Sequence, residues 1–397
     1  MARMIDADGH IVEPRVLWEE YVEPEFRDRV IQIRPDREGR EIFYVNGEAR
    51  NPLGGSIVMS VIPGGFLDLE RARNATYDDV LPGSYDPEER IRVMDVEGIE
   101  LAVLYPSFWL LYGDITDARV AAAACRAYNN WMADFCRPYP ARLFGVAPMP
   151  LQDVGEAIRE MRRAVTELNF KAVFIRPNPF NGRRLNDPAY DPFWHEAQEL
   201  GIPVAIHSSF GTRMPTLGGD RYRDPFFSHM VCHPFEQQAA CMDMICGGVL
   251  ERYPRLKVAF LEAGVGWIGY WLDRMDCHYI AIDVEPHVDA AEFGRVETNL
   301  EVVFIGKRLG CDLDGDAGQR HRERLRLRRP LPRRGEVRGR AGGTCRGIRL
   351  VRRRQQAEVL HRLGAGFDGI RGVAMSLRRC VDIGFRNKVA GGVLGNV

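Results

Sequence analysis

The sequence predicts an α/β protein whose main body is a parallel (β/α)8 barrel. Short runs of Val, Ile, Leu, Ala and Phe alternate with segments of helical periodicity over the first 305 residues. Apolar runs of this kind are typical of strands that are buried on both faces of a parallel sheet. Repeated strand–helix units favour a barrel. A doubly wound sheet is the alternative, but no G-x-G-x-x-G motif follows the first strand.

The expected elements follow one another along the chain. Strands are predicted at 3–7, 99–106, 144–148, 171–176, 203–207, 257–262 and 300–305. Apolar residues at helical spacing predict helices at 87–96, 117–137, 153–168, 188–200, 235–252 and 267–279. Seven strands leave one strand of the barrel unaccounted for. The segment 13–85 is rich in Pro, Gly and charge, with a weak strand signal at 41–45, so we expect a rim insertion there.

The composition limits the class of protein. A chain of 397 residues with 45% hydrophobic and 27% charged residues is typical of a soluble globular protein. No apolar run is long enough to span a membrane, and the polar residues that follow Met1 predict no secretory signal. Nine scattered cysteines form no C-x-x-C pair, which indicates reduced thiols. We therefore expect a cytoplasmic protein with no membrane partner.

Residues 306–397 differ from the rest of the chain. They hold 21 Arg and two Lys against eight acidic residues, and their only aromatic residues are Phe367 and Phe385. Such a tail could bind nucleic acid through phosphates, or be a disordered extension, or be an out-of-frame translation of a GC-rich gene. We favour the last interpretation for 306–397, because the composition changes abruptly. A nucleic-acid partner is disfavoured, because aromatic residues are not interleaved with the arginines.

A metal site is predicted where strands 3–7 and 203–207 end. Alternate residues of a strand point the same way, so Asp8 and His10 can reach a common point. His207 ends the later strand, and barrel sites form at the carboxyl ends of strands. A carboxylate with imidazoles suits zinc, manganese or iron; we expect zinc, with manganese as the alternative. Otherwise Asp8 caps a turn and His207 is a hydrogen-bonded structural residue.

Three further side chains are candidates for chemistry. Glu262 ends the sixth strand and could transfer a proton, or be a structural carboxylate bonded to backbone. His233 precedes a proline at the start of a helix, so it could face the site from a loop, or cap the helix. Arg176 ends the fourth strand and could hold a substrate carboxylate through two parallel hydrogen bonds, or form a salt bridge on the rim.

Several of these segments also match a known family. Residues 5–14 (IDADGHIVEP), 205–207 (AIH), 233–236 (HPFE) and 247–264 (GGVLERYPRLKVAFLEAG) resemble the amidohydrolase-related family. That branch of the amidohydrolase superfamily contains aminocarboxymuconate semialdehyde decarboxylase and aromatic-acid decarboxylases. The resemblance implies a barrel with a zinc or manganese ion that decarboxylates, hydrolyses or hydrates small carboxylic acids, often aromatic ones. It also implies a homo-oligomer, because members often form dimers or tetramers.

The resemblance assigns positions residue by residue and reveals two departures. Asp8 and His10 stand where the family has its first-strand metal pair, often His-x-His, and His207 stands at the fifth-strand ligand. Glu262 replaces the histidine that acts as acid or base in the decarboxylases. The family's eighth-strand Asp, usually within a Ser-Asp-Tyr-Pro-His block, has no counterpart; a cluster of aspartates at 312–316 lies in a Gly-rich loop.

Together these features predict a metal-dependent hydrolase or carboxy-lyase of the amidohydrolase superfamily. We expect non-oxidative decarboxylation or hydrolysis of a small, often aromatic carboxylic acid. We expect the metal-dependent barrel to span 1–305. The competing interpretation is a catalytically impaired barrel with a basic tail that binds nucleic acid.

Overall fold

The computed structural model describes residues 4–50, 54–62, 68–209, 212–222, 224–264, 266–281 and 303–305. Within these ranges, parallel strands follow one another in chain order. They are β1 (Met4–His10), β5 (Ile99–Tyr105), β6 (Leu143–Gly145), β7 (Ala147–Pro148), β8 (Val173–Ile175), β9 (Val204–His207), β10 (Val258–Leu261) and β11 (Val303–Ile305). Every predicted strand is therefore confirmed, with shifts of a few residues at some ends.

Each strand pairs with its neighbour in the sequence. One sheet has the order β1-β5-β6 and the other has the order β11-β10-β9-β8-β7. β6 and β7 are separated only by Val146, so they continue one another along a single interrupted strand. This sequential parallel order is that of a (β/α)8 barrel and differs from the order of a doubly wound sheet. The place of an eighth strand lies outside the described residues.

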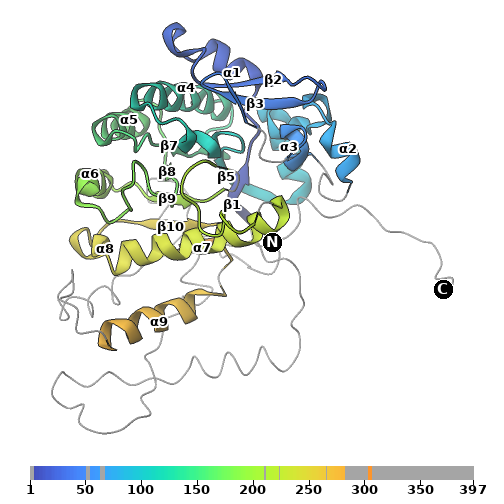
Figure 1. Ribbon diagram of the computed structural model, residues 1–397. Coiled ribbons are helices and arrows are strands. Elements are labelled where there is room, and N and C mark those ends of the chain that lie inside the picture. The colour runs from blue at the N-terminus through green and yellow to red at the C-terminus, as the bar shows by residue number, and fades with distance from the viewer. Residues whose placement is uncertain are drawn as a thin grey trace, which may run out of the picture.

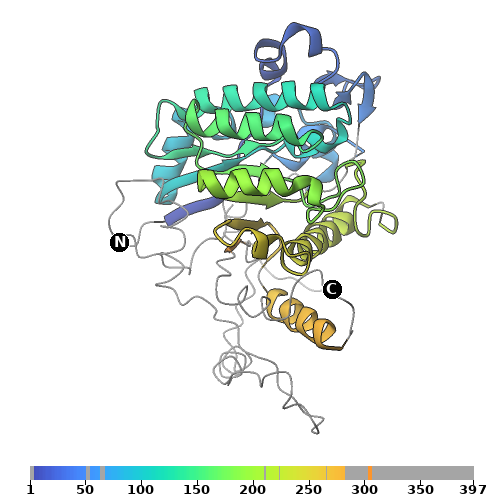
Figure 2. The ribbon, with the colours of Figure 1, turned by 90° about the vertical axis from the view of Figure 1, so that its left-hand side faces the viewer.

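Helices follow the strands and cover their outer side. They are α3 (Pro87–Glu97), α4 (Ala118–Cys136), α5 (Val154–Thr166), α6 (Asp191–Leu200), α7 (Pro225–Ile245), α8 (Val249–Arg252) and α9 (Ile268–Ala281). Figures 1 and 2 show α4, α5 and α6 side by side along one flank of the strands, as their mutual contacts require. Among the described residues, no helix combines the length and apolarity needed to cross a bilayer.

Aspartates begin most of these helices. A carboxylate accepts backbone N–H groups of the first turn at each of four N-caps: Asp86, Asp117, Asp153 and Asp224. These groups have no partner inside the helix, so capping by a short acidic side chain stabilises the end. Gly98 ends α3 at φ 71°, a left-handed conformation that favours glycine.

The start of α7 corrects one prediction. The sequence analysis placed a helix at 235–252 with His233 at its beginning. The structure instead begins α7 at Pro225, which follows the Asp224 cap and occupies the first helical position, where proline is tolerated. Pro234 lies inside the helix, where it costs one backbone hydrogen bond. His233 is therefore on the third turn of a helix, and not in a loop or at a cap.

The segment 13–85 forms a small structure of its own beside the barrel strands. An antiparallel sheet contains β2 (Ile31–Pro35), β3 (Glu41–Val45) and β4 (Glu48–Arg50). Short helices accompany it: α1 (Arg15–Glu20) and α2 (Leu69–Arg73), with 3-10 turns at Pro24–Phe26, Ile57–Ser60, Tyr77–Asp79 and Pro82–Ser84. Two other 3-10 turns, Trp109–Asp114 and Pro188–Tyr190, follow barrel strands. The weak strand signal at 41–45 is confirmed as β3.

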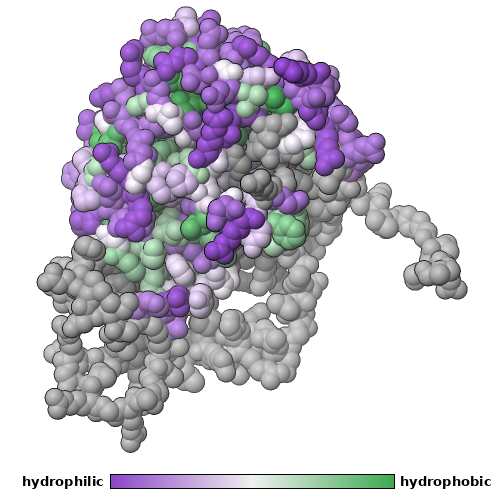
Figure 3. Space-filling view, viewed as in Figure 1, coloured by the Kyte–Doolittle hydropathy of each residue, from purple (hydrophilic) through white to green (hydrophobic). Residues whose placement is uncertain are grey.

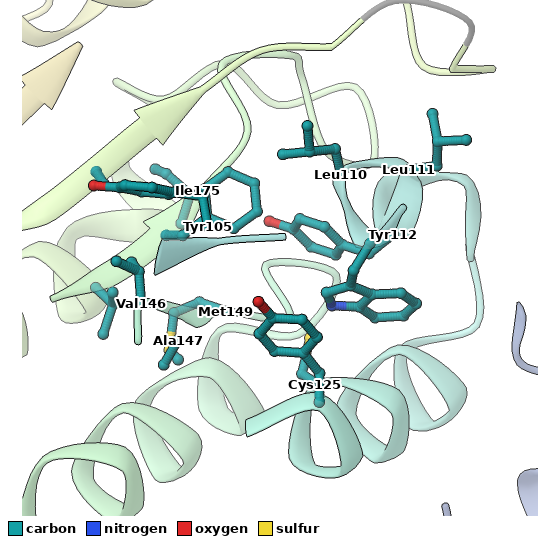
Figure 4. Packing of buried hydrophobic residues seen from close by; sticks show 14 of the residues in the cluster. Tyr105, Leu110, Leu111, Tyr112, Cys125, Val146, Ala147, Met149 and Ile175 are labelled. Atoms are coloured by element: carbon teal, nitrogen blue, oxygen red, sulfur yellow. The ribbon is translucent and has the colours of Figure 1, made fainter. Parts of the chain in front are cut away.

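The core lies between the strands and the helices outside them. Figure 4 shows Tyr112, Cys125, Val146 and Met149 among the side chains of this core, between α4 and the strands. All four side chains are fully buried, and burying each large one contributes roughly 1.5–3 kcal/mol. Figure 3 shows mostly hydrophilic residues on the outer surface, although α7 exposes apolar side chains such as Phe226. This packed core fixes the strand ends that carry the site.

Candidate metal centre

A bulge in β1 sets the direction of its polar side chains. Asp6 pairs with Ala102 of β5 and Gly9 pairs with Leu104, so three steps along β1 match two along β5. Gly9 suits this bend, because a Cβ atom there would lie 2.6 Å from Oδ2 of Asp6. Asp6 is thus held beside the bulge, where one of its oxygens accepts the backbone N–H of Asp8 at 3.3 Å.

Asp8, His10 and His207 come together at the carboxyl ends of β1 and β9. One potential ligand atom from each lies within 4.8 Å of the others. His207 Nε2 is 3.7 Å from Asp8 Oδ1, and the His207 side chain is completely buried. Two N or O donors on a tetrahedral zinc ion, with bonds of about 2.0–2.2 Å, stand roughly 3.3–3.6 Å apart. Small side-chain adjustments would therefore bring all three predicted ligands onto one ion.

The two histidines are held in the tautomer that metal binding needs. His10 Nδ1 donates to the carbonyl oxygen of Pro106 at 2.8 Å, and His207 Nδ1 donates to that of Ser208 at 2.6 Å. A carbonyl only accepts, so Nδ1 carries a proton in both rings, and Nε2 is the atom left to bind a metal once its own proton is lost. The two rings meet edge to face at 5.0 Å. One carboxylate and two imidazoles arranged in this way fit a divalent transition metal.

Glu262 stands directly after β10 and faces the same point. Its Oε2 lies 3.2 Å from His207 Nε2 and 3.5 Å from His233 Nδ1. The Glu262 backbone adopts φ 54°, a left-handed conformation that costs a side-chain-bearing residue energy and that clusters at functional sites. The fold thus accepts strain at the position where this carboxylate enters the centre.

The charges around Glu262 control its ionisation. Burial raises the pKa of the carboxyl, but the hydrogen bond from His207 and the electrostatic attraction of the surrounding imidazoles hold it well below its usual range. Burial lowers the pKa of His233 to about 3, with the charges of His229 and His207 adding to the effect and Glu262 opposing it. At neutral pH the pair therefore consists of an ionised carboxylate and a neutral imidazole.

Arg176 directly follows β8 and lies in a buried setting. Its guanidinium is fully buried. It donates to the carbonyl oxygens of Leu110 and Ser209, and to Asn178 Oδ1 at 2.8 and 3.1 Å. Asn178 in turn donates to the carbonyl oxygen of Pro215 at 3.0 Å. These bonds tie together the loops that follow β5, β8 and β9.

His229 is a residue of this region that the sequence analysis missed. It stacks on His233 with ring centroids 4.1 Å apart, and its ligand atom joins those of His233 and Glu262 within 4.8 Å. The signal was present as the spacing H-x-x-x-H, which places two histidines on one face of a helix. The misplaced helix start hid this relation.

Comparison with known proteins assigns the family. The family model described as amidohydrolase (Amidohydro_2) matches residues 5–308. The chain therefore belongs to this amidohydrolase family. The match ends close to the change of composition at residue 306.

Two curated relatives and one solved structure illustrate the likeness. A 2-amino-3-carboxymuconate-6-semialdehyde decarboxylase from Dictyostelium discoideum is 30% identical, over 45% of this chain and 48% of the relative. A gamma-resorcylate decarboxylase from a Rhizobium species is 27% identical, over 51% of this chain and 63% of the relative. The chain thus spans less than two thirds of the length of either relative.

The solved structure is that of 5-carboxyvanillate decarboxylase from Novosphingobium aromaticivorans, with bound manganese and a nitrobenzoic acid. It superposes with a TM-score of 0.54 at 20% identity, and the match covers 77% of this chain and 80% of that one. At this level of identity the likeness concerns the fold, which confirms the predicted barrel architecture.

Proposed function

We propose that this chain is a metal-dependent carboxy-lyase that removes carbon dioxide from a small, ring-bearing carboxylic acid. The observation that carries the proposal is the convergence of Asp8, His10 and His207 on one point, with Glu262 3.2 Å from the innermost imidazole. The decarboxylase relatives favour this reaction over hydrolysis, which the same site chemistry could also serve.

Asp8, His10 and His207 would hold the metal. A bound divalent ion supplies Lewis-acid polarisation of the substrate oxygens and orients the carboxylate. Manganese is present in the related decarboxylase structure, and the donor set here suits either manganese or zinc. We retain zinc as the expected ion, with manganese as the alternative.

We assign proton transfer to Glu262. A ligand role for His207 Nε2 would end its hydrogen bond with Glu262. The freed carboxylate would take a proton from solvent water and deliver it to the ring carbon that loses carbon dioxide. His233 Nδ1, 3.5 Å from Glu262 Oε2, would orient the carboxylate or relay the proton. General acid–base catalysis by such a positioned group is worth about 10²–10⁴-fold in rate.

Arg176 has another role in this proposal. The contacts of its buried guanidinium favour positioning of the loops after β5, β8 and β9 over contact with the substrate. The substrate carboxylate would then be held by the metal. The substrate is expected to be a single small ring, and the chain is expected to work as a homo-oligomer in the cytoplasm. Cys125, Cys136, Cys232, Cys241 and Cys246 are free thiols, which supports a reducing compartment.

Within this proposal the catalytic unit is 1–305, with 13–85 as its rim insertion. Residues 306–397 lie outside the described residues. The family match ends at residue 308, close to the start of this segment. We keep the interpretation that this tail is translated out of frame. Resequencing the gene tests it: a single-base error near codon 306 is expected, and an intact frame through the arginine-rich segment would reject it.

The experiment for the function is a product assay. The purified chain, loaded with Mn²⁺ or Zn²⁺, is incubated with a panel of hydroxylated benzoic acids, and carbon dioxide release is measured. We expect release from at least one acid, its loss in Glu262→Gln, and its retention in the control His195→Ala, which changes an exposed histidine on α6. Cleavage of esters or lactones without carbon dioxide release would establish hydrolysis instead.

A further inference from the structure

A second set of potential ligands lies beside the first. His229, His233 and Glu262 offer one donor atom each within 4.8 Å of one another, and none of the three belongs to the set of Asp8, His10 and His207. We propose that His229, His233 and Glu262 form a second binding site for a divalent cation such as Zn²⁺ or Mn²⁺.

The helix α7 arranges two of these ligands. His229 and His233 are four residues apart, so both side chains emerge on the same face of the helix. Their rings lie nearly parallel, 24° apart, with centroids separated by 4.1 Å. Helical H-x-x-x-H pairs present two imidazoles to one ion, as in the zinc-binding H-E-x-x-H motif. The carboxylate of Glu262 adds a third ligand, which leaves a fourth position open.

The state of the His233 side chain points independently to a ligand. Only 6% of this side chain is exposed, and its Nδ1 makes no hydrogen bond within the described residues. The nearest carboxylate oxygen, Oε2 of Glu262, is 3.5 Å away, at the limit for a hydrogen bond. A buried polar atom without a partner costs about 1–3 kcal/mol in ordinary cores, so such atoms are rare unless they serve a ligand. A cation held by both residues would satisfy them together.

Glu262 joins the two sets. The same oxygen, Oε2, is 3.2 Å from His207 Nε2 and 3.5 Å from His233 Nδ1. The second cation would therefore sit beside the first, as in enzymes with two neighbouring metals. It would also engage Glu262 and His233, which the proposed function assigns to proton transfer. This consequence rests on that function: excess cation should inhibit turnover by withdrawing both side chains from the substrate.

Metal stoichiometry tests the site without reference to activity. The full-length protein is equilibrated with Zn²⁺ over a range of free concentrations, and bound metal is measured by equilibrium dialysis with elemental analysis. We expect two equivalents in the unaltered protein, one equivalent in His229→Ala, and two in the control His195→Ala. A single equivalent in the unaltered protein, or two in His229→Ala, would overturn the second site.

A second measurement separates this inference from the proposed function. Two adjacent Mn²⁺ ions couple magnetically. At saturation the electron paramagnetic resonance intensity per ion should therefore be reduced in the unaltered protein. It should be normal in His229→Gln, a milder substitution than His229→Ala. Asp8→Ala should remove the more tightly bound metal equivalent. If the Asp8→Ala protein still binds that equivalent, the first site is contradicted and the second site is not. If the resonance intensity per Mn²⁺ ion is undiminished in the saturated, unaltered protein, the second site is contradicted and the first site is not. Inhibition by excess Zn²⁺ should likewise disappear in His229→Gln.

Discussion

The two sets of ligands at this barrel mouth are built by different kinds of backbone. Asp8, His10 and His207 stand on β1 and β9, and β9 is hydrogen-bonded on both sides, to β8 and β10. His229 and His233 stand on one helix, next to Pro234, which removes a backbone hydrogen bond of that helix. A sheet fixes its side chains more rigidly than such a helix does. We therefore expect tight binding at the strand-built set and weaker binding at the helix-built set.

Removing a strand-built ligand should have the largest effect. His207→Ala takes away the innermost imidazole, which lies between the carboxylates of Asp8 and Glu262. Metal affinity should fall by far more than the roughly 10–100-fold lost when only an outer partner is removed, and turnover should fall to background. Elemental analysis after gel filtration measures the loss. Stoichiometric metal in a folded His207→Ala protein would mean that the first site lies elsewhere.

Substitution of Glu262, the residue that contacts both sets of ligands, should have the next largest effect. Glu262→Gln keeps the size of the side chain but removes its charge and its ability to exchange a proton. Turnover should fall about 10²–10⁴-fold, while the tight metal equivalent stays bound through Asp8, His10 and His207. Steady-state kinetics with parallel metal analysis checks both parts. A Glu262→Gln enzyme within threefold of normal turnover would remove Glu262 from the chemistry.

The positions of the strand-built ligands were predictable, and the reason is physical. A strand buried on both faces must be apolar, so Asp8, His10 and His207 stood out as polar groups at the ends of apolar runs. Parallel strands end at one face, which brought these residues together without knowledge of the helices. The same rule located Glu262, although its left-handed backbone and its contact with His207 depend on tertiary structure and carried no local signal.

The start of helix α7 and the hydrogen-bond partners of Arg176 could not be predicted from the sequence. Proline usually marks a helix start, so Pro234 suggested a boundary, but the Asp224 cap and the following proline provide a stronger one upstream. Arg176 does end a barrel strand as predicted. Its carbonyl partners, however, come from loops more than 30 residues away in the chain, and such contacts appear only once the loops are folded.

Arg176→Lys distinguishes positioning from substrate binding. Lysine keeps the charge but loses the planar fork that serves Leu110, Asn178 and Ser209 at once. Because more than one buried acceptor would lose its donor, we expect destabilisation by about 2–4 kcal/mol, with KM within twofold of normal. Urea unfolding and steady-state kinetics measure the two effects. An unchanged stability with a tenfold higher KM would instead support the predicted contact with the substrate carboxylate.

The smallest expected effect concerns Glu13, which follows the end of β1 by three residues. Its buried carboxylate accepts the backbone N–H groups of Phe108 and Trp109 at 3.0 and 2.7 Å. Burial nevertheless outweighs these bonds and raises the pKa of Glu13 from 4.5 to about 7. Between these values the native protein holds a proton that the unfolded chain releases, so the free energy of unfolding decreases as pH rises.

Glu13→Gln should remove this slope. We expect the native protein to lose about 2 kcal/mol of stability between pH 5 and pH 7.5 through this group, and the variant to lose correspondingly less. Urea unfolding at both values, with the metal chelated, provides the comparison. Parallel curves for the two proteins would show that Glu13 is ionised throughout, held so by Phe108 and Trp109.

The central claim is that β1 and β9 hold a divalent metal through Asp8, His10 and His207. Anomalous diffraction from crystals grown with Zn²⁺, recorded on both sides of the zinc absorption edge, tests it most directly. We predict a peak about 2.0–2.2 Å from an Asp8 oxygen and from Nε2 of both histidines, present at the lowest metal concentration that gives any peak. A first peak at another place, or none at saturating Zn²⁺, would contradict the account.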